Sequence, residues 1–152
     1  MIRRMKLHDV ETVAKIMVKN ELWRRYGVSL QSAKERFRKG LKDGALIYVI
    51  EENGNLVGFV WIVLKGAFDR SGYIELIGID PDYQGKGLGR KLMAFAESIV
   101  FETSDSMFLL VSDFNKRAQK FYKNLGYMEV GRIPDYIKEG ITELIYFKRR
   151  EA

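Results

Sequence analysis

The sequence predicts an α/β protein whose mixed sheet is built from unevenly alternating strands and helices. Two β-rich runs flank an Asn-Gly turn, a glycine-rich turn joins a strand-like run to a helical one, and helical spacing recurs elsewhere. The resulting order is β-αα-βββ-α-β-α-ββ, without the regular alternation of a doubly wound fold. A length of 152 residues, 47% hydrophobic and 30% charged, predicts one domain over residues 1–152.

The first third of the chain predicts one short strand and two helices. Residues 2–6 form the strand, and Asp9 is a good N-cap for a helix whose apolar residues follow at helical spacing. We expect residues 20–27 to be irregular. Ser29 caps the second helix, in which apolar residues recur every four positions at Ala33, Phe37 and Leu41.

The middle of the chain predicts three strands. Residues 45–50 and 56–64 form a hairpin, because Asn53 and Gly54 between them both tolerate positive φ. A looser loop follows over residues 65–71, and the next strand, residues 72–79, is apolar on both faces apart from Glu75. A strand of this kind is usually central in its sheet.

The last part predicts two helices and three strands. The glycine-rich turn leads into a helix with one apolar face, formed by Leu88, Leu92, Phe95, Ala96 and Ile99. Residues 107–111 form a short buried strand, and Asn115 caps a helix that stops at Gly126. Residues 128–133 and 142–147 form the final strands.

Composition excludes several kinds of site. The chain has no cysteine, so disulfides, thiolate nucleophiles and Cys-ligated metals are excluded, and we expect a cytoplasmic location. His8 is the single histidine and fits a solvated helix entry, so we expect no metal site. The longest apolar run, residues 56–64, is far shorter than the roughly 20 residues that span a bilayer. We expect no signal peptide and no membrane association.

The net charge of +6 limits the choice of partner only weakly. A basic protein can bind nucleic acid, an anionic cofactor or an acidic partner. The basic residues are dispersed, as on solvated helix faces, and neither an RNP-like aromatic motif nor a helix-turn-helix is present. We therefore expect no nucleic-acid partner, whereas edge strands at the C-terminal end allow a homodimer.

The glycine-rich turn has the chemistry of a phosphate site. In Gln84-Gly85-Lys86-Gly87-Leu88-Gly89, glycines allow close approach of the backbone, and the following helix N-terminus attracts anions. The spacing fails the dinucleotide fingerprint, whose third glycine comes one residue later. It also fails the P-loop, because Asp80 stands where the first glycine belongs, and the kinase loop, which lies between two strands.

Two motifs give the chain a specific resemblance to the GNAT N-acetyltransferase superfamily. Gln84 to Gly89 match Q-x-x-G-x-G/A after a strand that ends in Asp80-Pro81, and residues 115–127 match N-x-x-A-x-x-F-Y-x-x-x-G-F/Y. The resemblance implies the GNAT fold, with splayed central strands, and acetyl-CoA as cofactor. Residues 131–140 weakly resemble the ribosomal-protein N-terminal acetyltransferase branch, although Leu110 stands where that branch has a Glu.

The resemblance also implies which residues hold the cofactor. The strand end would pair with the pantetheine arm, and the turn would hold the pyrophosphate, with added charge from Lys86 and Arg90. The implied cofactor-binding residues are Ile77, Gly78, Ile79, Gln84, Gly85, Lys86, Gly87, Leu88, Gly89 and Arg90. Asn115 matches a position that commonly contacts the cofactor, and this role is compatible with that of a helix N-cap.

Two residues are candidates for catalysis. Tyr122 matches the family's general acid, and a phenol with a pKa of about 10 can protonate a departing thiolate. A core tyrosine on this apolar helix face would look the same. Glu75 is the candidate general base, because desolvation in an apolar strand would raise its pKa. The alternative is that Glu75 pairs with a basic neighbour on the sheet.

The implied reaction moves an acetyl group from acetyl-CoA to a primary amine by direct attack on the thioester. The acceptor is a protein N-terminus, a lysine or a small-molecule amine. Trp23, Tyr26 and Tyr136 could line its groove, and each fits simple packing equally well. The alternatives are an N-acyltransferase that uses another acyl group and a non-catalytic acyl-CoA-binding module without a working base.

Overall fold

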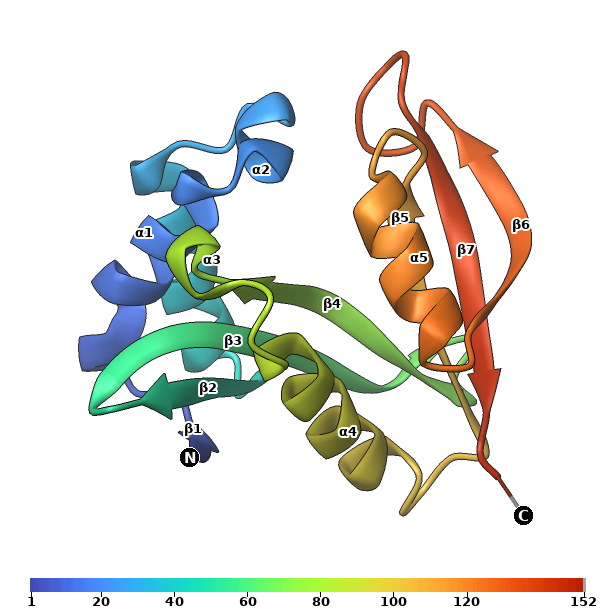
Figure 1. The fold of residues 1–152 in the computed structure, drawn as a ribbon, viewed down its shortest axis with the longest axis horizontal. Coiled ribbons are helices and arrows are strands. Elements are labelled where there is room, and N and C mark those ends of the chain that lie inside the picture. The colour runs from blue at the N-terminus through green and yellow to red at the C-terminus, as the bar shows by residue number, and fades with distance from the viewer. Residues whose placement is uncertain (152) are drawn as a thin grey trace. The chain divides into compact units, whose positions relative to one another are not determined.

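Strands and helices follow the predicted order, with one additional short helix, in a computed structural model that describes residues 1–151 (Figure 1). The strands are β1 (Ile2–Arg4), β2 (Leu46–Glu52), β3 (Asn55–Ala67), β4 (Ser71–Ile79), β5 (Ser106–Ser112), β6 (Met128–Pro134) and β7 (Thr142–Arg149). The helices are α1 (Val10–Lys19), α2 (Glu21–Arg25), α3 (Leu30–Lys42), α4 (Leu88–Val100) and α5 (Lys116–Asn124), with 3-10 turns at Leu7–Asp9 and Pro81–Tyr83.

The strands form a mixed sheet in the order β1-β2-β3-β4-β5-β7-β6, which confirms the predicted α/β class and the central place of β4. The residues divide into two compact units. The first unit comprises Met1–Val63 and Glu75–Ala96. The second comprises Leu64–Ile74 and the described residues from Glu97 onward.

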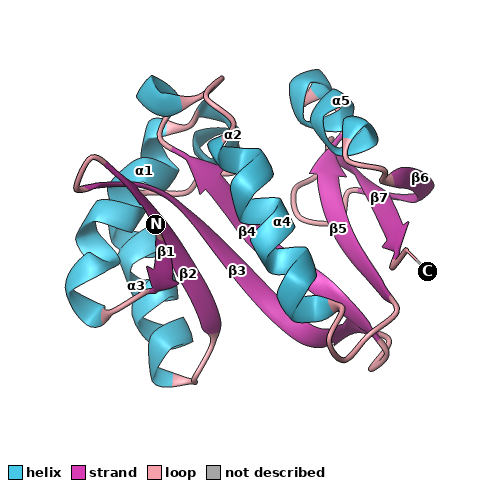
Figure 2. Ribbon diagram, turned by 60° about the horizontal axis from the view of Figure 1, so that its bottom comes forward, coloured by secondary structure: helices cyan, strands magenta, loops and turns pink. Residues whose placement is uncertain are grey.

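In the first unit, β1 and β3 flank β2, and both pairings are antiparallel. The turn between β2 and β3 has positive φ at Asn53 (53°) and Gly54 (81°), which confirms the predicted hairpin. Helices α1 and α3 lie against one face of these strands (Figure 2). Their core includes Phe37, whose ring meets that of Phe59 edge-on at 5.3 Å between centroids.

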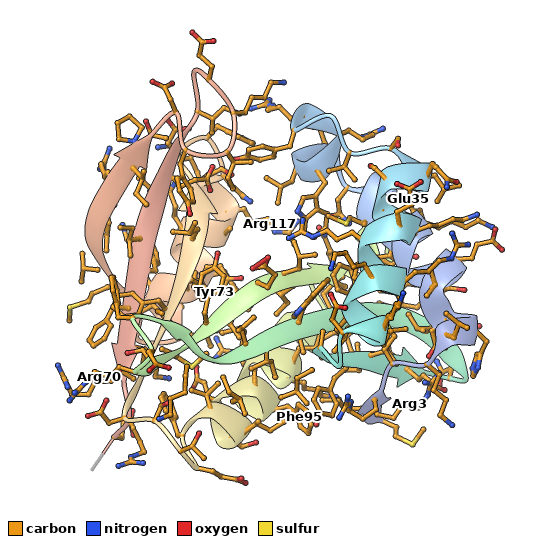
Figure 3. All side chains as sticks on the ribbon, turned by 180° about the vertical axis from the view of Figure 1, so that it is seen from behind. Arg3, Glu35, Arg70, Tyr73, Phe95 and Arg117 are labelled. Atoms are coloured by element: carbon orange, nitrogen blue, oxygen red, sulfur yellow. The ribbon has the colours of Figure 1, made fainter. Side chains whose placement is uncertain are left out.

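The first turns of α4 cover the opposite face of β2. The ring of Phe95, labelled in Figure 3, lies 4.6 Å from that of Tyr48. Leu92 and Met93 are fully buried, as expected for the apolar side of an amphipathic helix. Only residues 80–87 separate the end of β4 from the start of α4 in the first unit. The glycine-rich turn begins within this short connection.

In the second unit, β5 and β7 are antiparallel, β7 pairs with β6, and the start of β4 runs parallel to β5. Gly72 lies at this parallel pairing, and a Cβ there would come within 2.4 Å of Val100. Ser71 and Ser106 are buried side by side, with 2.6 Å between their hydroxyl oxygens. The tyrosines Tyr122, Tyr127 and Tyr146 from α5, its C-terminal loop and β7 form a cluster.

Three local predictions need correction. Residues 20–27 are not wholly irregular, since they contain α2, a five-residue helix with no buried residue and hence no apolar pattern to reveal it. The Asp9 side chain makes no cap bond to α1 because its carboxylate accepts from Arg3 and from the Lys6 backbone N–H. The loop expected over residues 65–71 is shorter, because β3 continues to Ala67.

Other local predictions are confirmed. The Ser29 hydroxyl accepts from the Ser32 N–H at the start of α3, and Asn115 Oδ1 accepts from the Ala118 N–H at the start of α5. Gly126 has a φ of 94° just after α5, the conformation that ends many helices. Within residues 1–151, no helix is both long enough and apolar enough to cross a bilayer.

Candidate functional site

The candidate site begins where β4 ends. The Asp80 N–H donates to the Val57 carbonyl at 2.7 Å, and Asp80 Oδ1 accepts from the Asp82 N–H at 2.9 Å. Pro81 opens a single 3-10 turn, which Pro favours at a first helical position. The chain therefore reverses within four residues, and Gln84 begins the glycine-rich turn.

The glycine-rich turn is exposed and pre-formed. Gly85 and Gly87 both have a φ of 81°, a region in which side chains with a Cβ are strained. A Cβ at either position would meet nothing within 4 Å, so backbone conformation and not crowding demands glycine here. Leu88 is 3% exposed and anchors the first turn of α4, whose N-terminal amides are thus held at an open surface.

The electrostatics of the turn favour an anion. The N-terminus of α4 carries partial positive charge, and Lys86 and Arg90 are exposed beside it. The Lys86 ammonium lies 5.2 Å from the centre of the Tyr83 ring, a cation–π contact that keeps the charge at the turn. Amide N–H groups, a helix N-terminus and two cations together form a suitable site for a pyrophosphate.

Sequence reasoning missed the side chains that hold this turn. Lys19 and Asn20, at the C-terminal end of α1, bond to Asp80, Asp82 and Gln84. No local pattern could have indicated these contacts, because more than 60 residues separate the partners.

Glu75 is paired with a cation. Its Oε1 accepts from an Arg36 guanidinium nitrogen at 2.9 Å, and its side chain is 32% exposed. Arg36 also lies over the ring of Trp61, 5.7 Å from its centre. The structure thus pairs Glu75 with a cation, as the alternative expects, but this cation comes from a helix and not from the sheet. The role of Glu75 as general base stays a prediction. Arg36 comes from α3, and nothing in its sequence context indicated this contact.

Trp23 lies against the strand end. A Cβ on Gly78 would be 2.7 Å from the Trp23 ring and 2.9 Å from Phe59, so only glycine lets the indole approach the backbone of β4 this closely. Trp23 also contacts the Phe59 ring, with 5.9 Å between centroids. Tyr26 is half-buried at the C-terminal end of α2. Both aromatic residues belong to the first unit, as do Ile77 and Ile79.

Tyr122 lies in the second unit and is 7% exposed. Its ring contacts those of Phe121, Tyr127 and Tyr146 edge-on, and burial raises the pKa of its hydroxyl, so the phenol stays protonated at neutral pH. The neighbouring Tyr127 hydroxyl donates to Glu97 at 2.8 Å, and Glu97 in turn accepts from Lys148 at 2.8 Å. The ring of Tyr122 is thus fixed by a well-packed cluster.

Asn115 and Tyr136 also belong to the second unit. The Asn115 oxygen is used by the helix cap, which leaves its NH₂ group as a possible donor to a ligand. Tyr136 is 60% exposed in the loop between β6 and β7. The Asp135 carboxylate accepts from the Gly140 N–H at 2.7 Å and orders that loop.

The candidate residues therefore form two groups, one in each unit. The first unit brings together Trp23, Glu75, Gly78 and the turn from Gln84 to Arg90 on consecutive or contacting segments. The second unit brings together Asn115 and Tyr122 on α5, with Tyr136 on the following loop. Among residues 1–151, no cluster of His, Asp or Glu side chains could hold a metal ion.

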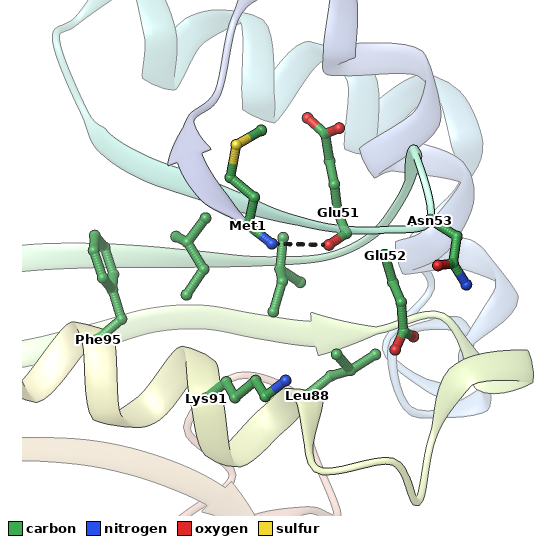
Figure 4. Close-up of a pocket in the computed structure, with 9 residues that line it drawn as sticks. Met1, Glu51, Glu52, Asn53, Leu88, Lys91 and Phe95 are labelled. Atoms are coloured by element: carbon green, nitrogen blue, oxygen red, sulfur yellow. Dashed lines mark hydrogen bonds between the residues drawn. The ribbon is translucent and has the colours of Figure 1, made fainter.

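A cavity of about 590 Å³ lies elsewhere in the first unit, between β2 and α4 (Figure 4). Ile50, Leu88 and Phe95 supply apolar walls, and Glu52 and Lys91 supply charge. One oxygen of Glu52 is buried and has no hydrogen-bond partner among the described residues. The cavity shares only Leu88 with the predicted cofactor residues, so the exposed turn and not this cavity is the better anion site.

Comparison with known proteins decides the family. The sequence profile of the Acetyltransferase (GNAT) family matches residues 15–127, which include the glycine-rich turn and the Asn115 motif. The chain belongs to the GNAT family. This membership confirms the resemblance that the two motifs indicate.

Known GNAT proteins resemble the chain over most of its length. A mycothiol acetyltransferase of Thermobispora bispora is 32% identical over 104 residues, which are 65% of this chain and 35% of that protein. An N-alpha-acetyltransferase RimI of Mycobacterium tuberculosis is 35% identical over 100 residues, 65% of this chain and 61% of that one. The chain thus spans about a third of the first relative's length.

Solved structures of acetyltransferases of the GNAT family confirm the fold, with TM-scores of 0.83 and 0.80. An aminoglycoside 6'-N-acetyltransferase complexed with coenzyme A superposes with a TM-score of 0.81, covering 98% of this chain and 96% of that one. The two sequences are only 13% identical, so the similarity concerns the fold.

Proposed function

We propose that this chain is an acetyl-CoA-dependent N-acetyltransferase that acts on a primary amine. The observation that carries the proposal is the exposed turn at the end of β4, with positive φ at Gly85 and Gly87 and open space above both glycines. Membership of the GNAT family and the coenzyme A in a structure of the same fold support it.

The residues of the turn fit the cofactor's pyrophosphate. Residues 85–90 include the first turn of α4, whose N–H groups have no partner within the helix, and a dianion needs such donors together with positive charge. Lys86 and Arg90 supply that charge. The backbone of Ile77, Gly78 and Ile79 offers partners to the amides of the pantetheine arm. Asn115 is proposed as a further contact through its NH₂ group.

Two side chains of this protein then transfer protons: one accepts a proton from the amine and the other donates a proton to the sulfur. Bound acetyl-CoA supplies an acetyl group activated as a thioester. When the acceptor nitrogen forms its bond to the acetyl carbon and the carbon–sulfur bond breaks, the amine proton passes to Glu75, directly or through water. Tyr122 donates its phenolic proton to the departing sulfur. Binding both reactants together supplies much of the rate.

The ion pair with Arg36 bears on the proposed role of Glu75. Arg36 occupies the carboxylate oxygen Oε1, which would otherwise be available to accept the proton. This competition favours one alternative, a module that binds acyl-CoA without a working base. Mutation of Glu75 therefore belongs in any test of the activity.

The acceptor is proposed only as a class. One relative is named for mycothiol and another as an N-alpha-acetyltransferase, so a protein N-terminus, a lysine and a small-molecule amine all belong in the assay. We propose that Trp23, Tyr26 and Tyr136 contact the acceptor. Trp23 has the firmest support, because its ring touches Gly78 of the proposed cofactor strand.

The test follows release of free CoA with a panel of such amines, beside direct binding of acetyl-CoA. We expect Tyr122→Phe to lower kcat about tenfold or more, with little change in acetyl-CoA affinity. Tyr48→Phe is a matched control, since it removes a hydroxyl from a tyrosine that contacts Phe95 and has no proposed role. Unchanged turnover in Tyr122→Phe would remove this residue from the reaction.

Glu75→Gln separates the two functions. If Glu75 is the base, this variant binds acetyl-CoA as the wild type does and loses most of its turnover. If the wild type binds acetyl-CoA but acetylates no amine in the panel, the binding module is the better description. If it binds no CoA species, the proposal fails at the turn itself.

A further inference from the structure

Side chains at the C-terminal end of α1 form ion pairs and hydrogen bonds with the segment that leads into the glycine-rich turn. The Lys19 ammonium lies 2.8 Å from Asp80 Oδ1 and 2.7 Å from Asp82 Oδ2. Figure 1 shows this segment between β4 and α4, near the end of α1. Two carboxylates immediately before the turn are therefore bridged by one cation.

Asn20 forms a second contact to the same segment. Its Nδ2 donates to the Ile16 carbonyl at 2.8 Å and, over a longer 3.4 Å, to the Ile79 carbonyl. Its Oδ1 accepts from the Gln84 side-chain amide at 3.3 Å. One amide thus ties α1 to the last residue of β4 and to the first residue of the turn.

The charges of these side chains affect the affinity of the turn for an anion. Asp80 and Asp82 place two negative charges beside a turn that is proposed to bind a dianion, and like charges repel it. The side chains of Lys19, Asp80 and Asp82 together carry a charge of −1, whereas the two carboxylates alone carry −2. The carboxylates raise the pKa of Lys19 to about 12, so its charge is constant over any practical assay range.

We infer that Lys19 and Asn20 are positioning residues for the anion-binding turn, holding residues 80–84 in place and offsetting the charge of Asp80 and Asp82. The inference rests on the proposed function, since it concerns the cofactor's pyrophosphate. Neither residue lies in the two family motifs, and neither touches the proposed acetyl-transfer groups Tyr122 and Glu75 in the contacts described.

A purely structural role of Lys19 would appear in the stability of the protein and not in its affinity for CoA. The side chain of Lys19 is 45% exposed, so solvent screens its ion pairs and its loss changes overall stability little. The effect of a positioning role appears in affinity for ligands that carry the pyrophosphate. Acetyl-pantetheine, which lacks that group, provides the necessary contrast.

The experiment measures CoA dissociation constants by calorimetry in low salt. We expect Lys19→Met to weaken CoA binding about fivefold, and Lys19→Arg to restore it. Asp82→Asn removes one repulsive charge, so we expect it to tighten binding about threefold and to offset most of the effect of Lys19→Met in the double variant. The affinity for acetyl-pantetheine should be the same in the wild type and in all four variants.

Lys15→Met is the matched control. Lys15 lies one turn earlier on α1, is exposed, and loses the same charge without contacting the turn. If Lys15→Met weakens CoA binding as much as Lys19→Met, net charge and not position is responsible, and the inference is wrong. Equal CoA affinity in Lys19→Met and wild type also overturns it.

Asn20→Ala tests the second contact. We expect CoA binding to weaken about threefold to tenfold, with kcat at saturating acetyl-CoA unchanged. Equal weakening for acetyl-pantetheine would show general disruption and would overturn the role in pyrophosphate binding. Failure of the wild type to bind CoA refutes the proposed function instead, so the two failures are distinguishable.

Discussion

Replacing Gly87 by alanine separates the cost of backbone strain from the loss of anion binding. Gly87 has a φ of 81°, and its missing Cβ faces open space. The added methyl group therefore meets no atom, and the cost is that of holding an L-residue in the left-handed region, about 1–2 kcal/mol. For a chain of this length, such a loss lowers the melting temperature by roughly 2–8 °C.

The same substitution should damage ligand binding more than stability. If the turn shifts to relieve the strain, one or two amides no longer meet the pyrophosphate. Each charge-assisted hydrogen bond contributes about 1.5–3 kcal/mol, so we expect CoA affinity to fall about tenfold or more. Thermal melts with and without CoA measure both effects on one sample, because ligand binding stabilises the folded protein by a free energy that rises with the logarithm of ligand concentration over Kd.

Gly54→Ala is the control for strain. Gly54 has the same φ of 81° and the same open surroundings, but it lies in the β2–β3 hairpin. We expect the two variants to lose similar stability without ligand, and only Gly87→Ala to lose CoA-induced stabilisation. If both keep the full CoA shift, the reasoning about the turn is refuted.

Two further predictions concern stability. Asp9→Asn replaces one of the two oxygens that accept from Arg3 by an NH₂ group and removes the negative charge, which should cost about 2 kcal/mol at pH 7 in urea unfolding. Because Arg3 holds the pKa of Asp9 below 3.8, this difference persists above that pH and disappears as the pH falls further. Gly78→Ala sets a methyl group 2.7 Å from Trp23 and should cost about 1–3 kcal/mol, less when Trp23→Leu is also present. Equal costs in both backgrounds would contradict this close contact.

Much of the fold could be predicted because its signals are local. The Asn53-Gly54 turn, the Ser29 cap and the Gly126 stop each depend on the conformational preferences of one or two residues, and the structure has all three. The α2 helix escaped prediction because five residues with no buried side chain carry no periodic signal. Asp9 looked like an N-cap, but Arg3 competes for its carboxylate.

In the candidate site, too, the features with local signals could be predicted and the contacts between distant residues could not. The glycine-rich turn could be located from the sequence, since positive φ at Gly85 and Gly87 is a requirement that glycine meets almost alone. The surroundings of Glu75 could not, because Arg36 is 39 residues away in the chain and reaches it from another element. For Tyr122 the sequence favoured catalysis but left core packing open, and its burial beside Tyr127 and Tyr146 is compatible with both.

The sequence alone determined the order of elements apart from α2, the position of the glycine-rich turn, and the family motifs around Gln84 and Asn115. Only the tertiary structure decided which side chains meet: Arg36 with Glu75, and Lys19 with Asp80 across 61 residues. The physical reason is the separation along the chain between the residues that interact. Backbone preferences depend on neighbours a few residues away, whereas ion pairs depend on where packing of the whole chain places distant side chains.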